Sequence, residues 1–374
     1  MKETIGERLE RSGVSRRDFG IFCGKLMVAA PFGLAITNSL SVDAVAAEVA
    51  AARRPSIIWL QMQDCTGCTE TLLRPSEPDL ATLLFDVISL DYHETVMAPS
   101  GHDAELALKD AMEQNKGKYV LVVEGSIPTK DNGQYLRLAG QPGIQVLHDV
   151  AKDSAAVIAM GSCASWGGIG SSAPNPTGAV GVDSLIESKP IVNIPGCPPN
   201  PYTLLAVVLQ YARTGTLPAL DSLKRPKFAY DRLIHDHCPR RAHFDAGRFA
   251  KEFGDDGHRQ GWCLYRLGCK GPVTHAACST RNFNEVVDAW PIGVGHPCFG
   301  CTEQKVAWTL PLHQTADIEY PVPPSQYPPI YAEHAGVSPI ATGVGGLVGG
   351  ALVGAGIIAS RKLSESAPSN DGQE

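Results

Sequence analysis

Cysteine is the residue type through which this chain could do most chemistry, and eleven cysteines occur in its 374 residues. Cys65 and Cys68 are separated by two residues, a spacing that suits zinc, iron–sulfur clusters and some redox disulfides. Cys163 and Cys197 each follow a short apolar run. These four thiols are far apart in sequence, so only the fold can bring them together. We call Cys65, Cys68, Cys163 and Cys197 the strand-end group.

The second half of the chain carries six more cysteines among many glycines, prolines and histidines. Two residues separate His235 from Cys238, and this spacing makes His235 a better ligand candidate than His237. Few clear strands are evident there, so we expect a metal group to serve as its core, because thiolate ligation contributes folding free energy directly. The remaining candidates form a histidine group (His235, Cys238, Cys263 and Cys269) and a three-cysteine group (Cys278, Cys298 and Cys301).

The elements that must position the strand-end group are alternating strands and helices. Helices are expected at 102–115 and 202–214. This alternation predicts an α/β fold with a parallel, doubly wound, flavodoxin-like sheet. The predicted strands are Ile57–Gln61, Phe85–Leu90, Tyr119–Val123, Ala156–Met160 and Pro190–Ile194.

The carboxyl ends of parallel strands share one edge of a sheet, and ligands bind in the crevice outside that edge. Cys65, Cys163 and Cys197 each come just after a predicted strand, so four thiols should converge there. Four convergent thiolates can hold zinc or a [4Fe–4S] cluster, and an oxidising compartment would also permit two disulfides.

The N-terminal residues 1–50 are typical of an export signal. Arg16 and Arg17 form a twin-arginine motif, an apolar run follows, and small residues near Ala44 offer a cleavage site. The twin-arginine route carries folded proteins, as a cofactor inserted in the cytoplasm requires. Cys23 lies inside this segment and should be removed with it.

The C-terminal part predicts a membrane anchor. A proline-rich linker (321–338) precedes an uncharged stretch within 339–362, whose 20 residues from Ile340 to Ala359 span the hydrocarbon core of about 30 Å as a helix. Arg361 and Lys362 follow, so the tail (363–374) is expected in the cytoplasm and the body on the periplasmic side of the inner membrane.

Composition narrows the function classes. Charged residues make up 19% and hydrophobic residues 44%, which argues against disorder and allows a sizeable core. The net charge of −7 and the absence of a large Lys/Arg cluster in the sequence argue against a nucleic-acid binder. The body divides into a region at 51–223 with the predicted sheet and a cysteine-rich region at 224–320.

These motifs, in this order, resemble the small subunit of nickel–iron hydrogenases over essentially the whole chain. The chain is most similar to the membrane-bound, periplasm-facing uptake type. The stretches that carry the resemblance include Asp64-Cys65-Thr66-Gly67-Cys68-Thr69-Glu70, Val123-Glu124-Gly125-Ser126, Gly161-Ser162-Cys163, Pro195-Gly196-Cys197-Pro198, His235-Asp236-His237-Cys238, Gly261-Trp262-Cys263 and Pro297-Cys298-Phe299-Gly300-Cys301.

The resemblance implies an electron relay of three clusters. The strand-end group would hold a proximal [4Fe–4S] cluster, the three-cysteine group a medial [3Fe–4S] cluster and the histidine group a distal [4Fe–4S] cluster. The catalytic nickel–iron site would belong to a separate large subunit, the obligate partner, so no catalytic residue is expected in this chain. Electrons from H₂ would pass to a membrane quinone-linked partner, either a cytochrome b or a ferredoxin-like protein with an integral membrane subunit.

Two glycines bear on oxygen sensitivity. Oxygen-tolerant members of the family carry two extra cysteines around the proximal cluster, and the matching positions here are Gly67 and Gly168. The resemblance therefore implies an ordinary proximal cluster and an oxygen-sensitive enzyme. Glu70 could assist proton movement near the large subunit or serve as an exposed carboxylate at a helix start.

Two other interpretations compete. One is a non-catalytic periplasmic binding protein stapled by zinc or disulfides, which would be colourless where an iron–sulfur protein is brown. The other is the cluster-bearing subunit of respiratory complex I, which shares the proximal-cluster domain but lacks the cysteine-rich half and the export signal.

Overall fold

The computed structural model describes residues 54–318, except residue 77. The predicted export signal, linker, membrane helix and tail lie outside these residues. Within the described part, no helix is long and apolar enough to cross a membrane.

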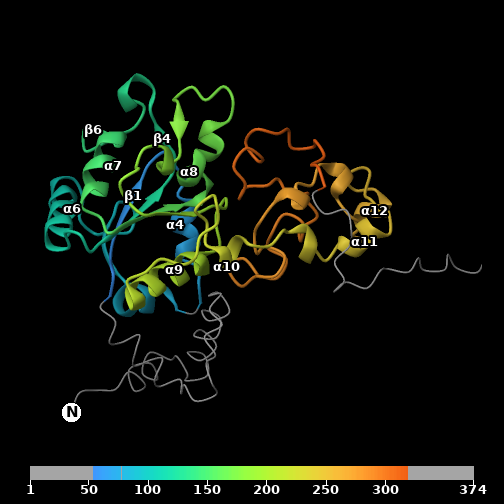
Figure 1. The fold of residues 1–374 in the computed structure, drawn as a ribbon, viewed down its shortest axis with the longest axis horizontal. Coiled ribbons are helices and arrows are strands. Elements are labelled where there is room, and N and C mark those ends of the chain that lie inside the picture. Colours follow the sequence, from blue (N-terminus) through green and yellow to red (C-terminus); the bar gives the residue numbers. More distant parts are fainter. Residues whose placement is uncertain (1–53, 77, 319–374) are drawn as a thin grey trace, which may run out of the picture. The chain divides into compact units, whose positions relative to one another are not determined.

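A five-stranded, fully parallel sheet forms the centre of the α/β region (Figure 1). Its spatial order, β2-β1-β3-β7-β9, is the order 2-1-3-4-5 of flavodoxin-like folds. The prediction of a parallel α/β sheet is thus confirmed. The strands are β1 (Ser56–Gln61), β2 (Ser89–His93), β3 (Val120–Glu124), β7 (Ala156–Met160) and β9 (Ile191–Ile194).

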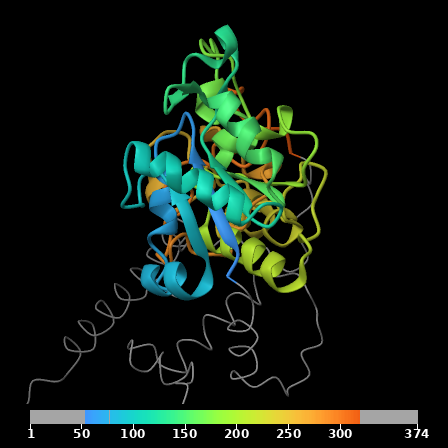
Figure 2. The same cartoon turned by 90° about the vertical axis from the view of Figure 1, so that its left-hand side faces the viewer.

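Side chains of the central strands alternate between two apolar layers, as period-2 geometry requires. On one face, residues such as Trp59 and Val122 pack against α4 (Gly67–Leu72), α9 (Pro201–Thr214) and α10 (Lys227–Tyr230). On the other face, residues such as Leu60 and Leu121 pack against α6 (His102–Gln114), α7 (Gly143–Lys152) and α8 (Gly161–Trp166). Figure 2 shows α6 and α7 covering their side of the sheet. Burial on both faces explains why these strands are nearly continuous apolar runs.

The prediction of a second strand over Phe85–Leu90 is wrong. The short helix α5 (Leu80–Thr82) runs into a π-helical turn over Leu83–Val87, and β2 begins only at Ser89. Leu83 and Val87 are buried while Phe85 is 72% exposed, which is a helical pattern. The other predicted strands and both predicted helices agree with the structure to within one residue at each end.

Short elements connect the main ones. Two small antiparallel pairs join β4 (Ile127–Pro128) to β8 (Ala179–Val180) and β5 (Arg137–Leu138) to β6 (Gln141–Pro142). Single helical turns occur at Lys130–Gly133, Gly168–Ser171 and Val182–Ser184.

The cysteine-rich region has a different construction. Among its described residues, 224–318, the extended pairings are isolated bridges, and the helices after α10 are α11 (Arg241–Asp245), α12 (Asp256–Arg259) and turns at His235–His237, Tyr265–Leu267 and Gly271–Val273. Its apolar core is small and includes Cys238, Cys269 and Cys298. The candidate ligands are therefore part of the core itself.

A buried ion-pair network joins the two regions. Arg225, which is 4% exposed, donates to Asp221 at 2.7 Å and to Glu303 at 2.8 Å. Glu303 also accepts from the backbone N–H of His275 at 2.7 Å. The network lies two residues from Cys301 and fixes that loop against the α/β region.

Candidate metal centres

The strand-end group converges at the carboxyl edge of the sheet. Cys65 follows β1, Cys163 lies in α8 after β7, and Cys197 follows β9. Burial raises the pKa of Cys68 well above its usual value, and Glu124, Cys163, Cys197 and Cys65 raise it further. The structure thus brings all four thiols within electrostatic range of one another, as predicted from the strand ends.

Glycine allows the backbone to close around these thiols. Gly161 has a φ of +87°, and a Cβ there would lie 2.5 Å from the sulfur of Cys68. Gly168 has a φ of +50°, and a Cβ there would lie 2.6 Å from the sulfur of Cys163. A side chain at either position would collide with a candidate ligand, so only glycine allows the backbone to pack this closely against the sulfurs.

Glu124 is a further residue of this candidate site, and the sequence did not single it out. It ends β3, is 1% exposed, and accepts backbone N–H groups from Cys68 at 2.9 Å and Thr69 at 3.1 Å. The indole N–H of Trp59 donates to its other oxygen at 3.1 Å. The carboxylate therefore anchors the start of α4, which carries Cys68. The available signal is a single acidic residue closing an otherwise apolar central strand.

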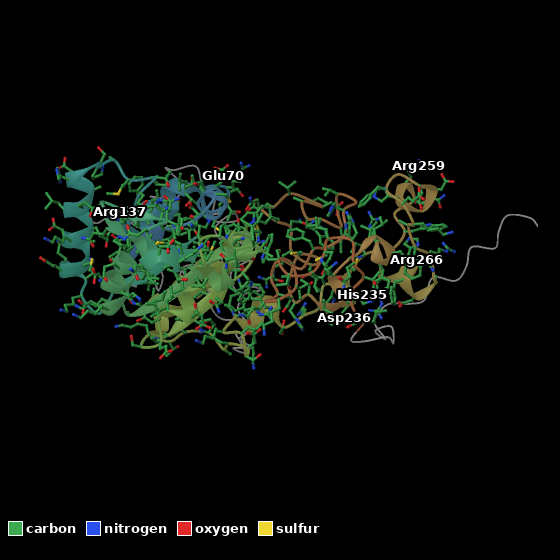
Figure 3. The ribbon with its side chains drawn as sticks, turned by 90° about the horizontal axis from the view of Figure 1, so that it is seen from above. Glu70, Arg137, His235, Asp236, Arg259 and Arg266 are labelled. Atoms are coloured by element: carbon green, nitrogen blue, oxygen red, sulfur yellow. The ribbon has the colours of Figure 1, made fainter. Side chains whose placement is uncertain are left out.

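Glu70 lies on the surface of α4, where it forms an exposed ion pair with Arg74 (Figure 3). This contact fits the interpretation of Glu70 as an exposed carboxylate near a helix start.

The histidine group surrounds one cavity. His235, Cys238, Cys263 and Cys269 all line it, together with residues that include Arg241. His235 lies in the cysteine-rich region (Figure 3). It is 6% exposed, and its Nε2 atom has no hydrogen-bond partner among the described residues. An orphaned buried nitrogen facing thiols is the arrangement expected of a metal ligand.

The protonation state of His235 suits ligation. Burial, with a contribution from the charge of Arg241, lowers the pKa of His235 to about 4. The imidazole is therefore neutral at pH 7 and can donate its Nε2 lone pair to a metal. His237, two residues on, is only half-buried.

Buried thiols in the cysteine-rich region resist ionisation. Burial raises the pKa of Cys263 to about 12 and that of Cys278 to about 11. None of the ten cysteines within residues 54–318 is in a disulfide. Within the same residues, no three His, Cys, Asp or Glu side chains converge tightly enough for a single metal ion.

The three-cysteine group lies between the other two. The thiol of Cys301 interacts electrostatically with Cys278 and with Cys197 of the strand-end group. Cys298 interacts with Cys301 and with Cys269 of the histidine group. The three groups are thus consecutive neighbours, in the order strand-end, three-cysteine, histidine.

Ser162 joins two of these groups through one buried hydroxyl. Its Oγ donates to the backbone carbonyl of Cys301 and accepts the N–H of Gly196 at 3.0 Å. The loops that carry Cys163, Cys197 and Cys301 are therefore tied together at one atom.

Comparison with known proteins agrees with this geometry. The C-terminal family of the NiFe/NiFeSe hydrogenase small subunit matches residues 230–312, and the family described as NADH ubiquinone oxidoreductase, 20 Kd subunit matches residues 65–211. The chain is 49% identical to the Hydrogenase-2 small chain of Escherichia coli K12, over 94% of this chain and 93% of that one. The chain belongs to the family of nickel–iron hydrogenase small subunits.

Other relatives support the same placement. The quinone-reactive Ni/Fe-hydrogenase small chain of Wolinella succinogenes is 45% identical over 79% of this chain and 82% of that one. Among solved structures, the [NiFeSe] hydrogenase of Desulfovibrio vulgaris Hildenborough matches with a TM-score of 0.63 and 35% identity, covering 70% of this chain and 98% of that one. As a hydrogenase small subunit, the chain is part of an oxidoreductase, and the prediction of the family is confirmed.

Proposed function

We propose that this chain is the electron-transferring subunit of an uptake hydrogenase. In this proposal, the strand-end group holds a proximal [4Fe–4S] cluster, the three-cysteine group a medial [3Fe–4S] cluster and the histidine group a distal [4Fe–4S] cluster. When bound, these clusters would take up and release single electrons that originate from H₂. The observation that carries the proposal is the unbroken succession of the three groups, through Cys197 and Cys301 and then through Cys298 and Cys269.

The residues of this chain would position and tune the clusters. Glu124 holds the start of α4 and thereby Cys68. His235 supplies a neutral ligand where the other sites supply thiolate, and imidazole ligation raises the potential in Rieske centres. The same direction at the distal site would favour electron flow away from the proximal site.

The proximal site is the exposed end of the relay. Cys65 and Cys197 are exposed in the chain alone. The nearby Ile169 is 68% exposed. An apolar side chain and thiols at the surface favour coverage by another protein. We propose that this edge is covered by the nickel–iron large subunit, which would contain the catalytic metals.

Export, anchoring and domain division complete the proposal. Residues 1–50 would direct twin-arginine export, 51–223 and 224–320 would form the two cluster-bearing domains, and 339–362 would anchor the body to the inner membrane. One relative carries the name periplasmic [NiFe] hydrogenase small subunit 1 and another is called quinone-reactive. These names support a periplasmic position and a quinone-linked membrane acceptor.

The proposed oxygen sensitivity rests on Gly67 and Gly168. A cysteine at 168 would need the left-handed backbone of Gly168 and would crowd Cys163 at 2.6 Å. An electron paramagnetic resonance (EPR) signature of a doubly oxidisable proximal cluster would contradict an ordinary cluster there.

The decisive experiment is metal and sulfide analysis of the anaerobically purified complex. We expect brown protein whose iron and acid-labile sulfide account for three clusters. The His235→Ala variant should lose the distal signal, while the matched control His237→Ala should keep it. Zinc without iron, or cysteines paired as disulfides, would favour the stapled binding protein instead.

A further inference from the structure

Within the described residues of the cysteine-rich region, the two most deeply buried cations, Arg241 and Lys270, have different charge partners. Arg241 is 1% exposed and pairs with Asp245 at 2.9 Å and with Asp236 at 3.5 Å. Lys270 is also 1% exposed, but no carboxylate within the described residues forms an ion pair with it. A buried charge without a counter-ion is costly, so its retention calls for an explanation.

The ammonium of Lys270 is held by backbone carbonyls alone. It donates to Gly268 at 2.9 Å, to Pro311 at 3.0 Å, to Leu312 at 3.1 Å and to Gln314. An ammonium has three N–H donors, whereas a neutral amine would turn a lone pair toward one of these oxygens. The carbonyl cage therefore favours the charged form and fixes its position.

The position of Lys270 is between two candidate cluster sites. It follows Cys269 of the histidine group directly in sequence, and its backbone N–H donates to the carbonyl of Cys298 at 2.6 Å. Burial lowers the pKa of Lys270, and the nearby thiols of Cys269 and Cys298 oppose that shift. Gly300, between Cys298 and Cys301, is so close that a Cβ there would lie 3.3 Å from the Cβ of Lys270.

We propose that Lys270 tunes the redox potentials of two clusters. As a buried cation with a fixed position and no carboxylate counter-ion, it would raise the reduction potentials of both the medial and the distal cluster. This inference rests on the proposed function. A thiolate-ligated cluster gains negative charge on reduction, and a cation buried nearby stabilises that reduced form, strongly so in a low-dielectric interior. The proximal site, at the far side of the three-cysteine group, should feel the charge least.

The alternative is that Lys270 only tethers residues 311–314 to the core. Two substitutions separate these interpretations, each measured in the intact, anaerobically purified complex by redox titration followed by EPR. Lys270→Gln removes the charge and keeps two N–H donors. Lys270→Arg keeps the charge but places it on a bulkier group that does not fit the same carbonyl cage. Lys251→Gln removes a charge from an exposed site of the same region and is the matched control.

In Lys270→Gln we expect lower midpoint potentials for the medial and distal clusters and an unchanged proximal potential. In Lys270→Arg we expect potentials close to wild type even where hydrogen exchange at 311–314 becomes faster. Lys251→Gln should change neither. Wild-type potentials in Lys270→Gln at full iron content would overturn the inference, and so would a fall in Lys270→Arg that accompanies faster exchange. Absence of iron from the wild-type complex would instead refute the proposed function.

Discussion

The α/β region and the cysteine-rich region are stabilised by different means. The first has two apolar layers on either side of a parallel sheet, with fully buried side chains such as Ile58 and Val207. The second has one small core in which Cys238, Cys269 and Cys298 take the place of aliphatic residues. Apolar packing alone can account for the first region, whereas the second has its candidate ligands where its core should be. We infer that the cysteine-rich region needs its clusters in order to fold. The α/β region, in contrast, should fold without its cluster and bind it afterwards.

The largest expected effect is the unfolding of the cysteine-rich region when one of its candidate cluster ligands is removed. In Cys298→Ala, limited proteolysis of the complex should cleave within 230–316 while 56–214 stays intact, because metal ligation supplies folding free energy. Cys65→Ala, which removes an exposed candidate ligand of the α/β region, is the control and should leave both regions resistant. Equal resistance of the two variants would break the comparison.

The next effect concerns the junction between the regions. Arg225→Met leaves Glu303 buried without its guanidinium partner, so we expect a loss of about 3–5 kcal/mol in the free energy of unfolding. Arg232→Met, which removes an exposed ion pair with Asp231, should cost about 0–1 kcal/mol. Anaerobic denaturant unfolding measures both. Similar costs for the two variants would show that the buried network does not hold the regions together.

A substitution in the sheet tests whether apolar packing stabilises the α/β region independently of the clusters. Leu121→Ala opens a cavity in the central strand β3 and should cost about 2–5 kcal/mol with or without clusters. The exposed Leu106→Ala should change stability by no more than about 0.5 kcal/mol. A Leu121→Ala cost that appears only in the cluster-loaded protein would mean that the sheet also depends on its metal.

The last effect, confined to acidic pH, is the pH dependence at His93, which is buried in the α/β region. Burial lowers the pKa of His93 from 6.5 to about 4. The unfolded chain binds this proton first as the pH falls, so the stabilisation is present above pH 6.5 and roughly 3 kcal/mol is lost by about pH 4. In His93→Gln this component should be missing. The free energy of unfolding is measured by denaturant titration at a series of pH values. An equal pH dependence in wild type and variant would refute the role of His93.

The α/β region can be predicted in outline because its physics is local and repetitive. Strands buried on both faces are continuous apolar runs, and β7 is predicted with its observed bounds, Ala156–Met160. The exception, β2, lies at the sheet edge and is only partly buried. Its sequence therefore contains few apolar residues. The preceding turn at Leu83–Val87 is more apolar, so its sequence is more typical of a buried strand than that of β2.

The candidate site can be predicted only in part. The convergence of the strand-end group follows from topology, and the family resemblance supplies the division of the other cysteines. Glu124, Arg225 and Lys270 escape prediction because their partners are remote in sequence. Arg225 and Glu303 are 78 residues apart, and Lys270 meets carbonyls 41 to 44 residues away. A single charged residue in a sequence does not reveal such a partner.

The hydroxyl of Ser162 would have a consequence for the rate of electron transfer in the proposed relay. One oxygen atom hydrogen-bonds the loop of Cys197 to the loop of Cys301, so two hydrogen bonds would fix the separation of the proposed proximal and medial clusters. Tunnelling probability decays steeply with separation. In the proposed relay, a side chain that neither binds metal nor carries charge would thereby influence the rate of electron transfer between the α/β region and the cysteine-rich region.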